Sequence, residues 1–150
     1  VIERPVEEVF AYLADNANEV DWQSNLVESS LTSDGPVGVG STGRDVRRSM
    51  GMKIVNDWEC SAFEPNRSFE FTVAKPITFT ASYALEPDTS GTRVTMRARP
   101  AGLAKAVWPL MASMGRKQYA ADFAKLKAIL EARSEAGVHN RSAASASVEA

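Results

Sequence analysis

Apolar side chains recur at every second position in three stretches of the middle of the chain, 69–73, 77–85 and 94–98, with Ser, Thr, Glu and Arg between them. This alternation predicts half-buried antiparallel strands. Short segments rich in Gly, Pro, Asn and Asp separate these strands from one another and from three earlier ones, which favours a meander over a parallel sheet. The six strands are expected at 26–32, 44–50, 53–63, 68–73, 77–86 and 92–99.

Helices are expected on both sides of this meander. Pro5 followed by Glu7 and Glu8 is typical of a helix start, because Pro is tolerated in the first turn and carboxylates there favour the positive end of the helix dipole. Asp15 and Asn16 stop this helix, and a short second helix follows at 19–22. We expect the two helices to form a helix-turn-helix corner that has no role in DNA binding.

A long helix is expected from Pro109 to about Glu135. It contains no further Pro, and it places four apolar residues on one face at intervals of four, three and four: Tyr119, Phe123, Leu126 and Leu130. Pro109 is expected to open or kink this helix. A helix of roughly 27 residues is about 40 Å long and crosses a whole sheet.

The ends of the chain bound the expected domain. Residues 137–150 are rich in Ala and Ser and have no hydrophobic period, so we expect a disordered tail after a single domain at 1–136. The chain starts at Val1 rather than Met. We therefore expect residues 1–3 to be the end of a truncated first strand, which brings the number of strands to about seven. A cleaved leader sequence is an open alternative.

Composition fits one globular domain with a sizeable core, since the chain has 150 residues, of which 44% are hydrophobic and 24% charged. The net charge is only −2, with acidic and basic residues interleaved, so a nucleic-acid partner is not expected. No apolar run approaches the ~20 residues of a membrane span, so we expect no integral membrane segment.

Few residues are suited to metal or nucleophilic chemistry. Cys60 is the only cysteine, which excludes an internal disulfide and a cysteine metal cluster and favours a cytoplasmic location. We expect it to be a small buried hydrophobe. His139 is the only histidine and lies in the expected tail, so His-dependent triads are excluded. The sequence predicts neither a metal nor a cofactor.

Residues 38–43 read GVGSTG and match the dinucleotide-binding pattern GxGxxG. That pattern needs a helix directly after it, whose N-terminus holds the pyrophosphate. The residues that follow, from Arg44 to Arg48, alternate like a strand instead. We therefore reject the nucleotide-binding interpretation.

Polar residues on two neighbouring strands are candidates for a site. Asn56 shares one strand face with Trp58, Cys60 and Ala62, and if that face is inward, its amide needs a partner from the protein, water or a ligand. Asp45, Arg47 and Ser49 raise the same question on the strand before it, and for these three residues we expect solvent exposure.

Aromatic and methionine side chains give the strongest indication of ligand binding, because rings and sulfur adapt well to apolar molecules. With Asn56, they form the expected lining of a cavity: Trp22, Trp58, Phe71, Phe79, Tyr83, Met96, Trp108, Met111 and Met114. An ordinary packed core is the alternative. Asn56 and Tyr83 are the candidates for orienting a ligand.

Several short motifs resemble a known superfamily. They mark turns and packing positions in residues 1–132 and read RPVEEVF at 4–10, GPVGVG at 35–40, FEPNR at 63–67, GTRVT at 91–95 and LKAILE at 126–131. With the order of elements, they are similar to the SRPBCC or START-like superfamily, in its polyketide cyclase/dehydrase and lipid-transport branch. The resemblance implies an α+β helix-grip fold, with about seven antiparallel strands around a long C-terminal helix and two short helices after the first strand.

The resemblance implies a deep, mostly apolar cavity but carries over no catalytic residue. Binding of a hydrophobic or aromatic small molecule, lipid-like or polyketide-like, is the preferred function. One alternative is a polyketide cyclase or dehydratase, for which Asn56, Tyr83 and Arg47 would be tested first, so enzyme activity stays open. Another is a protein-interaction module with a filled cavity. A monomer or a homodimer is expected.

Overall fold

The computed structural model describes the backbone of residues 1–146 and the side chains of residues 1–113 and 115–133. Three helical segments precede the sheet and its long helix in the order α1 (Val6–Ala14), η1 (Asn16–Asn18), α2 (Glu19–Trp22), β1 (Leu26–Leu31), β2 (Thr42–Ser49), β3 (Met52–Glu64), β4 (Ser68–Lys75), β5 (Phe79–Asp88), β6 (Gly91–Pro100) and α3 (Ala104–Ala146). All six expected strands and the three expected helices are present.

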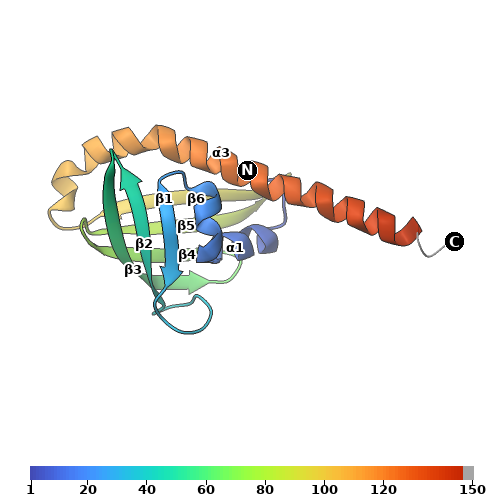
Figure 1. Ribbon diagram of the computed structural model, residues 1–150, viewed down its shortest axis with the longest axis horizontal. Coiled ribbons are helices and arrows are strands. Elements are labelled where there is room, and N and C mark those ends of the chain that lie inside the picture. The colour runs from blue at the N-terminus through green and yellow to red at the C-terminus, as the bar shows by residue number, and fades with distance from the viewer. Residues whose placement is uncertain (147–150) are drawn as a thin grey trace.

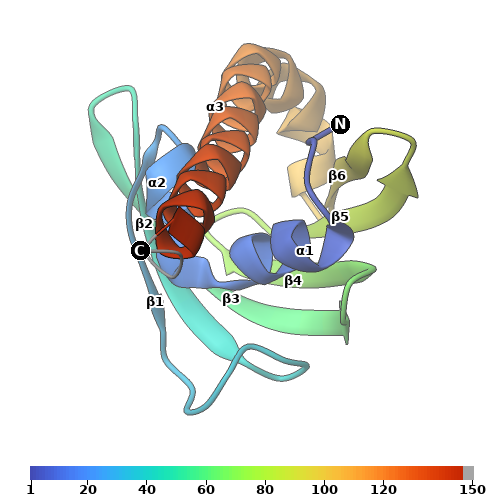
Figure 2. The same cartoon turned by 90° about the vertical axis from the view of Figure 1, so that its right-hand side faces the viewer.

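The strands form one antiparallel meander in the order β1-β2-β3-β4-β5-β6. Figure 2 shows the sheet curving around α3, with α1 and α2 on the same concave side. The predicted α+β helix-grip arrangement is therefore confirmed. The sheet has six strands rather than about seven, because the first residues contribute a single bridge between Ile2 and Thr92 of β6.

A bulge in β3 corrects one part of the predicted inner face. Asn56, Trp58 and Cys60 are buried at alternate positions as expected, but the register with β4 shifts between Cys60 and Ala62. The extra residue reverses the alternation. Ala62 consequently faces solvent, and Phe63 packs on the core instead.

Residues 122–130 of α3 are fixed to the core. Leu126 and Leu130 are buried, and the Phe123 ring lies 5.6 Å from that of Trp22 in α2. Asp122, also buried, accepts a hydrogen bond from the backbone N–H of Ser24 at 3.0 Å. Full burial of a leucine side chain is worth about 1.5–3 kcal/mol, so these contacts hold this part of α3 against α2 and the core.

Residues 104–121 of α3 pack far less. Leu103, just before the helix, is 95% exposed, and Leu110 and Tyr119 are exposed as well. The helix begins at Ala104, so Pro109 lies inside it rather than opening it. Because Pro109 has no N–H to donate, it interrupts the hydrogen bonds of the helix, and Figure 1 shows the first turns of α3 inclined to the rest.

The tail stays a prediction. α3 extends to Ala146, but side chains from residue 134 onward lie outside the described part of the chain, as does residue 147 onward altogether. His139 falls in this region too.

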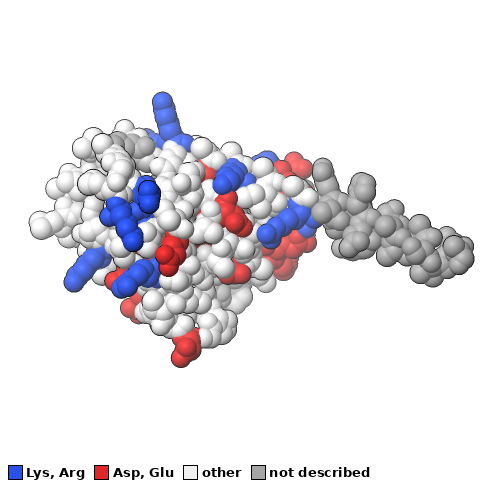
Figure 3. Space-filling model, in the orientation of Figure 1, with Lys and Arg blue, Asp and Glu red and all other residues white. Residues whose placement is uncertain are grey.

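On the face seen in Figure 3, Lys and Arg lie among Asp and Glu over the middle of the molecule, which fits the interleaving of acidic and basic residues in the sequence.

Two motif interpretations are confirmed. Residues 38–43 lead directly into β2 and not into a helix, so the GxGxxG pattern has no helix N-terminus for a phosphate. Cys60 is completely buried and unpaired, and burial raises the pKa of its thiol, as expected of a small core residue.

Gly43 allows the Trp58 indole to lie flat across β2, since the two residues pair between β2 and β3 and a Cβ at Gly43 would overlap the ring. We expect Gly43→Ala to lower the free energy of unfolding by about 1–3 kcal/mol, the usual cost of overpacking. Chemical denaturation measures this. Gly38→Ala is the control, because nothing lies within 4 Å of its Cβ position, and equal losses in both variants would contradict the account.

Candidate functional site

A cavity of about 60 Å³ lies between α2 and the inner face of β2 to β5. Its lining has an apolar and a polar part. The apolar part consists of Phe71, Val73, Phe79 and Ala81, and the polar part, called the polar wall below, consists of Glu19, Gln23, Asp45, Arg47, Asn56, Trp58 and Tyr83. The cavity is therefore small, and polar side chains line it beside the apolar ones.

Asp45 and Arg47 form an ion pair on the polar wall, with Arg47 Nη2 3.0 Å from Asp45 Oδ2. Asp45 is only 6% exposed, so the expected solvent exposure of these two residues is wrong, whereas Ser49 is exposed as predicted. Burial is tolerated because both charges have partners supplied by other elements. Arg47 Nη1 donates to Gln23 Oε1 at 2.7 Å and to Asn25 Oδ1 at 3.1 Å.

The Asp45 carboxylate connects three strands. Its Oδ1 accepts hydrogen bonds from Trp58 Nε1 of β3 at 3.0 Å and from Ser29 Oγ of β1 at 2.9 Å, while Oδ2 accepts from Arg47. Hydrogen bonds to an ionised acceptor are the stronger kind. This carboxylate therefore fixes the Trp58 indole and the Arg47 guanidinium together.

Glu19 is a second buried carboxyl beside Asp45. Burial, and then the charge of Asp45, raise the pKa of Glu19 to about 8, against the opposing effects of Arg47 and Ser29. Ser29 Oγ lies 3.4 Å from Glu19 Oε2, a longer contact than its bond to Asp45. At neutral pH Glu19 is therefore the protonated member of this pair, able to donate a hydrogen bond.

Two buried residues present neutral polar groups to the cavity. Asn56 is 8% exposed and Tyr83 is 7% exposed, and their polar atoms are not among the buried, unpartnered ones, which in the described residues are Arg4 Nε and Trp22 Nε1. The Asn56 amide and the Tyr83 hydroxyl are therefore open to the cavity and free to contact a ligand or water. Burial, followed by the negative charge of Glu19, raises the pKa of Tyr83, so its hydroxyl stays neutral. The ring stacks on Phe69 with centroids 4.7 Å apart.

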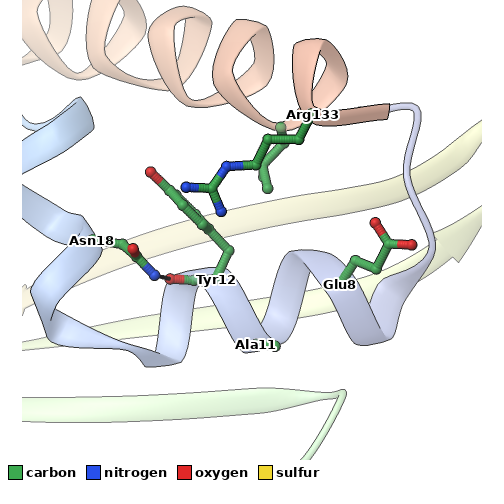
Figure 4. Close-up of a pocket in the computed structure, with 6 residues that line it drawn as sticks. Glu8, Ala11, Tyr12, Asn18 and Arg133 are labelled. Carbon is green, nitrogen blue, oxygen red and sulfur yellow. Dashed lines mark hydrogen bonds between the residues drawn. The ribbon is translucent and has the colours of Figure 1, made fainter. Parts of the chain in front are cut away.

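A second, more open pocket of about 330 Å³ lies between α1 and α3 (Figure 4). Arg133 places its guanidinium over the Tyr12 ring, 4.5 Å from the centroid, and Asn18 Nδ2 donates to the Tyr12 carbonyl at 3.1 Å. Most polar groups of this pocket are therefore already engaged in contacts within the protein. The sequence analysis did not single out this pocket.

Residues 1–131 match the family described as polyketide cyclase/dehydrase and lipid transport. The chain belongs to this family. That confirms the resemblance seen in the sequence. A comparison with curated proteins finds no match.

Solved structures agree with this family fold. Protein NE0264 from Nitrosomonas europaea has a TM-score of 0.69 at 21% identity, covering 88% of this chain and 90% of its own. SA2116 from Staphylococcus aureus, described as a protein of unknown function, has a TM-score of 0.69 at 13% identity, with 90% and 91% covered. Ara h 8.0201 has a TM-score of 0.66 at 11% identity, with 87% and 93% covered. At these identities the similarity shows the fold alone.

The residues that were predicted to line a cavity fall into those that line it, one that lies beside it and those that lie elsewhere. Asn56, Trp58, Phe71, Phe79 and Tyr83 do line the cavity, while Trp108 lies beside it with its ring centroid 5.8 Å from that of Phe79. The others lie elsewhere: Trp22 and Met96 pack in the core, Met111 is exposed, and the side chain of Met114 is outside the described residues. Their part in binding stays a prediction.

Four wall residues of the cavity were not among the candidates from the sequence: Glu19, Gln23, Val73 and Ala81. Asp45 and Arg47 were candidates, but they were expected to be exposed to solvent. One feature of the sequence could have indicated that Asp45 is buried. It shares a strand face with Gly43, whose lack of a side chain leaves room for the Trp58 ring. No such feature marks Glu19, since it starts a four-residue helix. Among the described residues, no helix is long and apolar enough to cross a membrane, and no group of three metal-ligating side chains is assembled.

The raised pKa of Glu19 makes stability depend on pH. Stability from the neutral carboxyl is fully present below the ordinary pKa of 4.5 and is lost as pH rises to about 8. Relative to Glu19→Gln, we expect the free energy of unfolding of the native protein to fall by up to about 1.4 kcal/mol per pH unit between these values. Urea denaturation across this range measures the difference. The exposed Glu59→Gln is the control, and parallel profiles for native protein and Glu19→Gln would contradict the assignment.

Proposed function

We propose that the protein binds a small molecule with an aromatic or other apolar body and a polar end in the cavity between α2 and β2 to β5. The observation that carries this proposal is that the Asn56 amide and the Tyr83 hydroxyl line the same cavity as the apolar side chains of Phe71, Val73 and Phe79. Each hydrogen bond that a ligand oxygen makes to one of these polar groups is worth about 1 kcal/mol.

The size of the cavity limits the ligand. A volume of about 60 Å³ is below the roughly 150 Å³ of an engineered cavity that binds benzene. Binding of even one ring therefore requires some lining side chains to move. The neighbouring side chain that moves most easily is Trp108, which contacts the lining residue Phe79 and stands on the weakly packed start of α3.

A cyclase or dehydratase is the second candidate, and one observation favours it. Glu19 is a buried carboxyl beside a second carboxylate, and its pKa of about 8 suits a general acid at neutral pH. Strongly shifted carboxyls in clefts are common at catalytic sites. Turnover that depends on Glu19 would distinguish this enzyme from a carrier.

The proposal also extends to location and partners. One buried, unpaired cysteine is typical of a reducing compartment, so we place the protein in the cytoplasm. A lipid-like molecule is one class of ligand that the family description suggests. Nucleic acid is not proposed as a partner, given the net charge of −2.

Tyr83→Phe and Asn56→Leu test the polar contacts. We expect each variant to bind benzyl alcohol about 5–10-fold more weakly, because each removes one hydrogen bond worth about 1 kcal/mol while keeping similar bulk. The titration follows the indole N–H signals of the three tryptophans by NMR.

Tyr12→Phe is the matched control, because its hydroxyl contacts Asp21 outside the cavity. Equal affinity in Tyr83→Phe, Asn56→Leu and native protein would remove the proposed contacts. Failure of benzyl alcohol to bind native protein would argue against a ligand cavity.

A further inference from the structure

We propose that the cavity selects neutral ligands, with a hydroxyl or carbonyl oxygen at the polar end, over carboxylates and amines of the same shape. This inference rests on the proposed function and names its ligand class. It follows from the charges on the polar wall, where the guanidinium of Arg47 and the carboxylate of Asp45 are already paired with each other.

Arg47 is the only cation on the cavity wall within the described part of the chain. Its charge is paired with Asp45 at 3.0 Å, and Nη1 is occupied by Gln23 and Asn25. A ligand carboxylate would need an unmatched cation to offset its loss of water. It would instead face Asp45, so its entry leaves the cavity with an excess negative charge.

A cationic amine finds no free carboxylate either. Ser29, Trp58 and Arg47 already donate to both oxygens of Asp45. Glu19, the other carboxyl, is neutral at pH 7. An ammonium group would therefore find only neutral oxygen acceptors, and it would gain a carboxylate charge to offset its loss of water only if Glu19 gave up its proton.

The groups that remain free to contact a ligand are both neutral. The Asn56 amide offers a donor and an acceptor, and the Tyr83 hydroxyl can do either. These groups complement an alcohol or a ketone without any change in charge. The geometry of the wall thus favours a neutral oxygen at this position.

Three probes with the same ring provide the test: benzyl alcohol, benzoate and benzylammonium, each titrated at about pH 6.5, where Glu19 is protonated. The reporter is the Trp58 indole N–H, which donates to Asp45. We expect the alcohol to bind at least tenfold more tightly than either ion. Equal or tighter binding of an ion overturns the inference while leaving the cavity proposal intact. Binding of none of the three overturns both.

Asp45→Asn supplies a gain-of-function test. The variant is made in the Glu19→Gln background, so that Glu19 cannot ionise in place of Asp45. It keeps an oxygen acceptor for Trp58 but leaves the Arg47 charge unmatched, so we expect benzoate affinity to rise at least tenfold, with little change for the alcohol. The matched control is Asp57→Asn, which breaks the exposed 2.6 Å pair with Arg44. No gain for benzoate in folded Asp45→Asn would overturn the charge-balance argument.

The pH profile tests the part played by Glu19. Three charged or titratable groups face Glu19: Asp45 and Arg47 of β2 and Tyr83 of β5. Tyr119 of α3 interacts electrostatically with Arg47 and with Tyr83. A ligand that displaces water makes ionised Glu19 costlier, so affinity for benzyl alcohol should fall up to tenfold per pH unit above about 8. Glu19→Gln should remove this fall, and an unchanged fall in that variant contradicts the argument.

Discussion

The buried carboxylate of Asp45 is the interaction on which the rest of the site depends. A charge inside a protein persists only with compensation, and here it comes from Arg47 on the same strand and from Ser29 and Trp58 on the two flanking strands. One group thereby connects β1, β2 and β3 on their inner face. The flat position of the indole also requires Gly43 opposite it.

Burial, and then the charge of the same carboxylate, raise the pKa of its neighbour Glu19 and keep it neutral. Two adjacent buried carboxyls do not both ionise easily. Arg47 forms its ion pair with Asp45. The polar wall therefore consists of one ion pair, one neutral acid and four neutral residues, Gln23, Asn56, Trp58 and Tyr83, which make it polar without net charge.

Two parts of α3 contribute differently to this arrangement. Residues 122–130 are anchored by Leu126 and Leu130, while the start of the helix reaches the cavity through the contact of Trp108 with Phe79. Under the proposed function, a ligand larger than the cavity would displace the weakly packed start of α3 and leave the core intact.

The fold was predictable because each signal lies within one element. Alternation in β4 to β6 and the spacing of Phe123, Leu126 and Leu130 report burial directly. Tyr119 continues the same spacing but is 44% exposed, so this spacing does not report burial along the whole helix.

The site was less predictable because its partners come from separate elements. Alternation along β2 shows that Asp45 and Arg47 share a face, but the buried side is decided by Gln23, Ser29 and Trp58 elsewhere in the chain. The β3 bulge that turns Ala62 outward has no signature in the local pattern. Aromatic residues were found more readily than their polar counterparts, since burial of a ring needs no specific partner.

The most direct test of the central claim is the titration of the Glu19 carboxyl itself, followed by carbon-13 NMR of glutamate-labelled protein and assigned with Glu19→Gln. The account predicts a midpoint near 8, far above the ordinary 4.5. A midpoint near 4.5 would mean that Glu19 is solvated and ionised at neutral pH. In that case the polar wall carries a net negative charge, and the account of a neutral cavity organised by Asp45 is wrong.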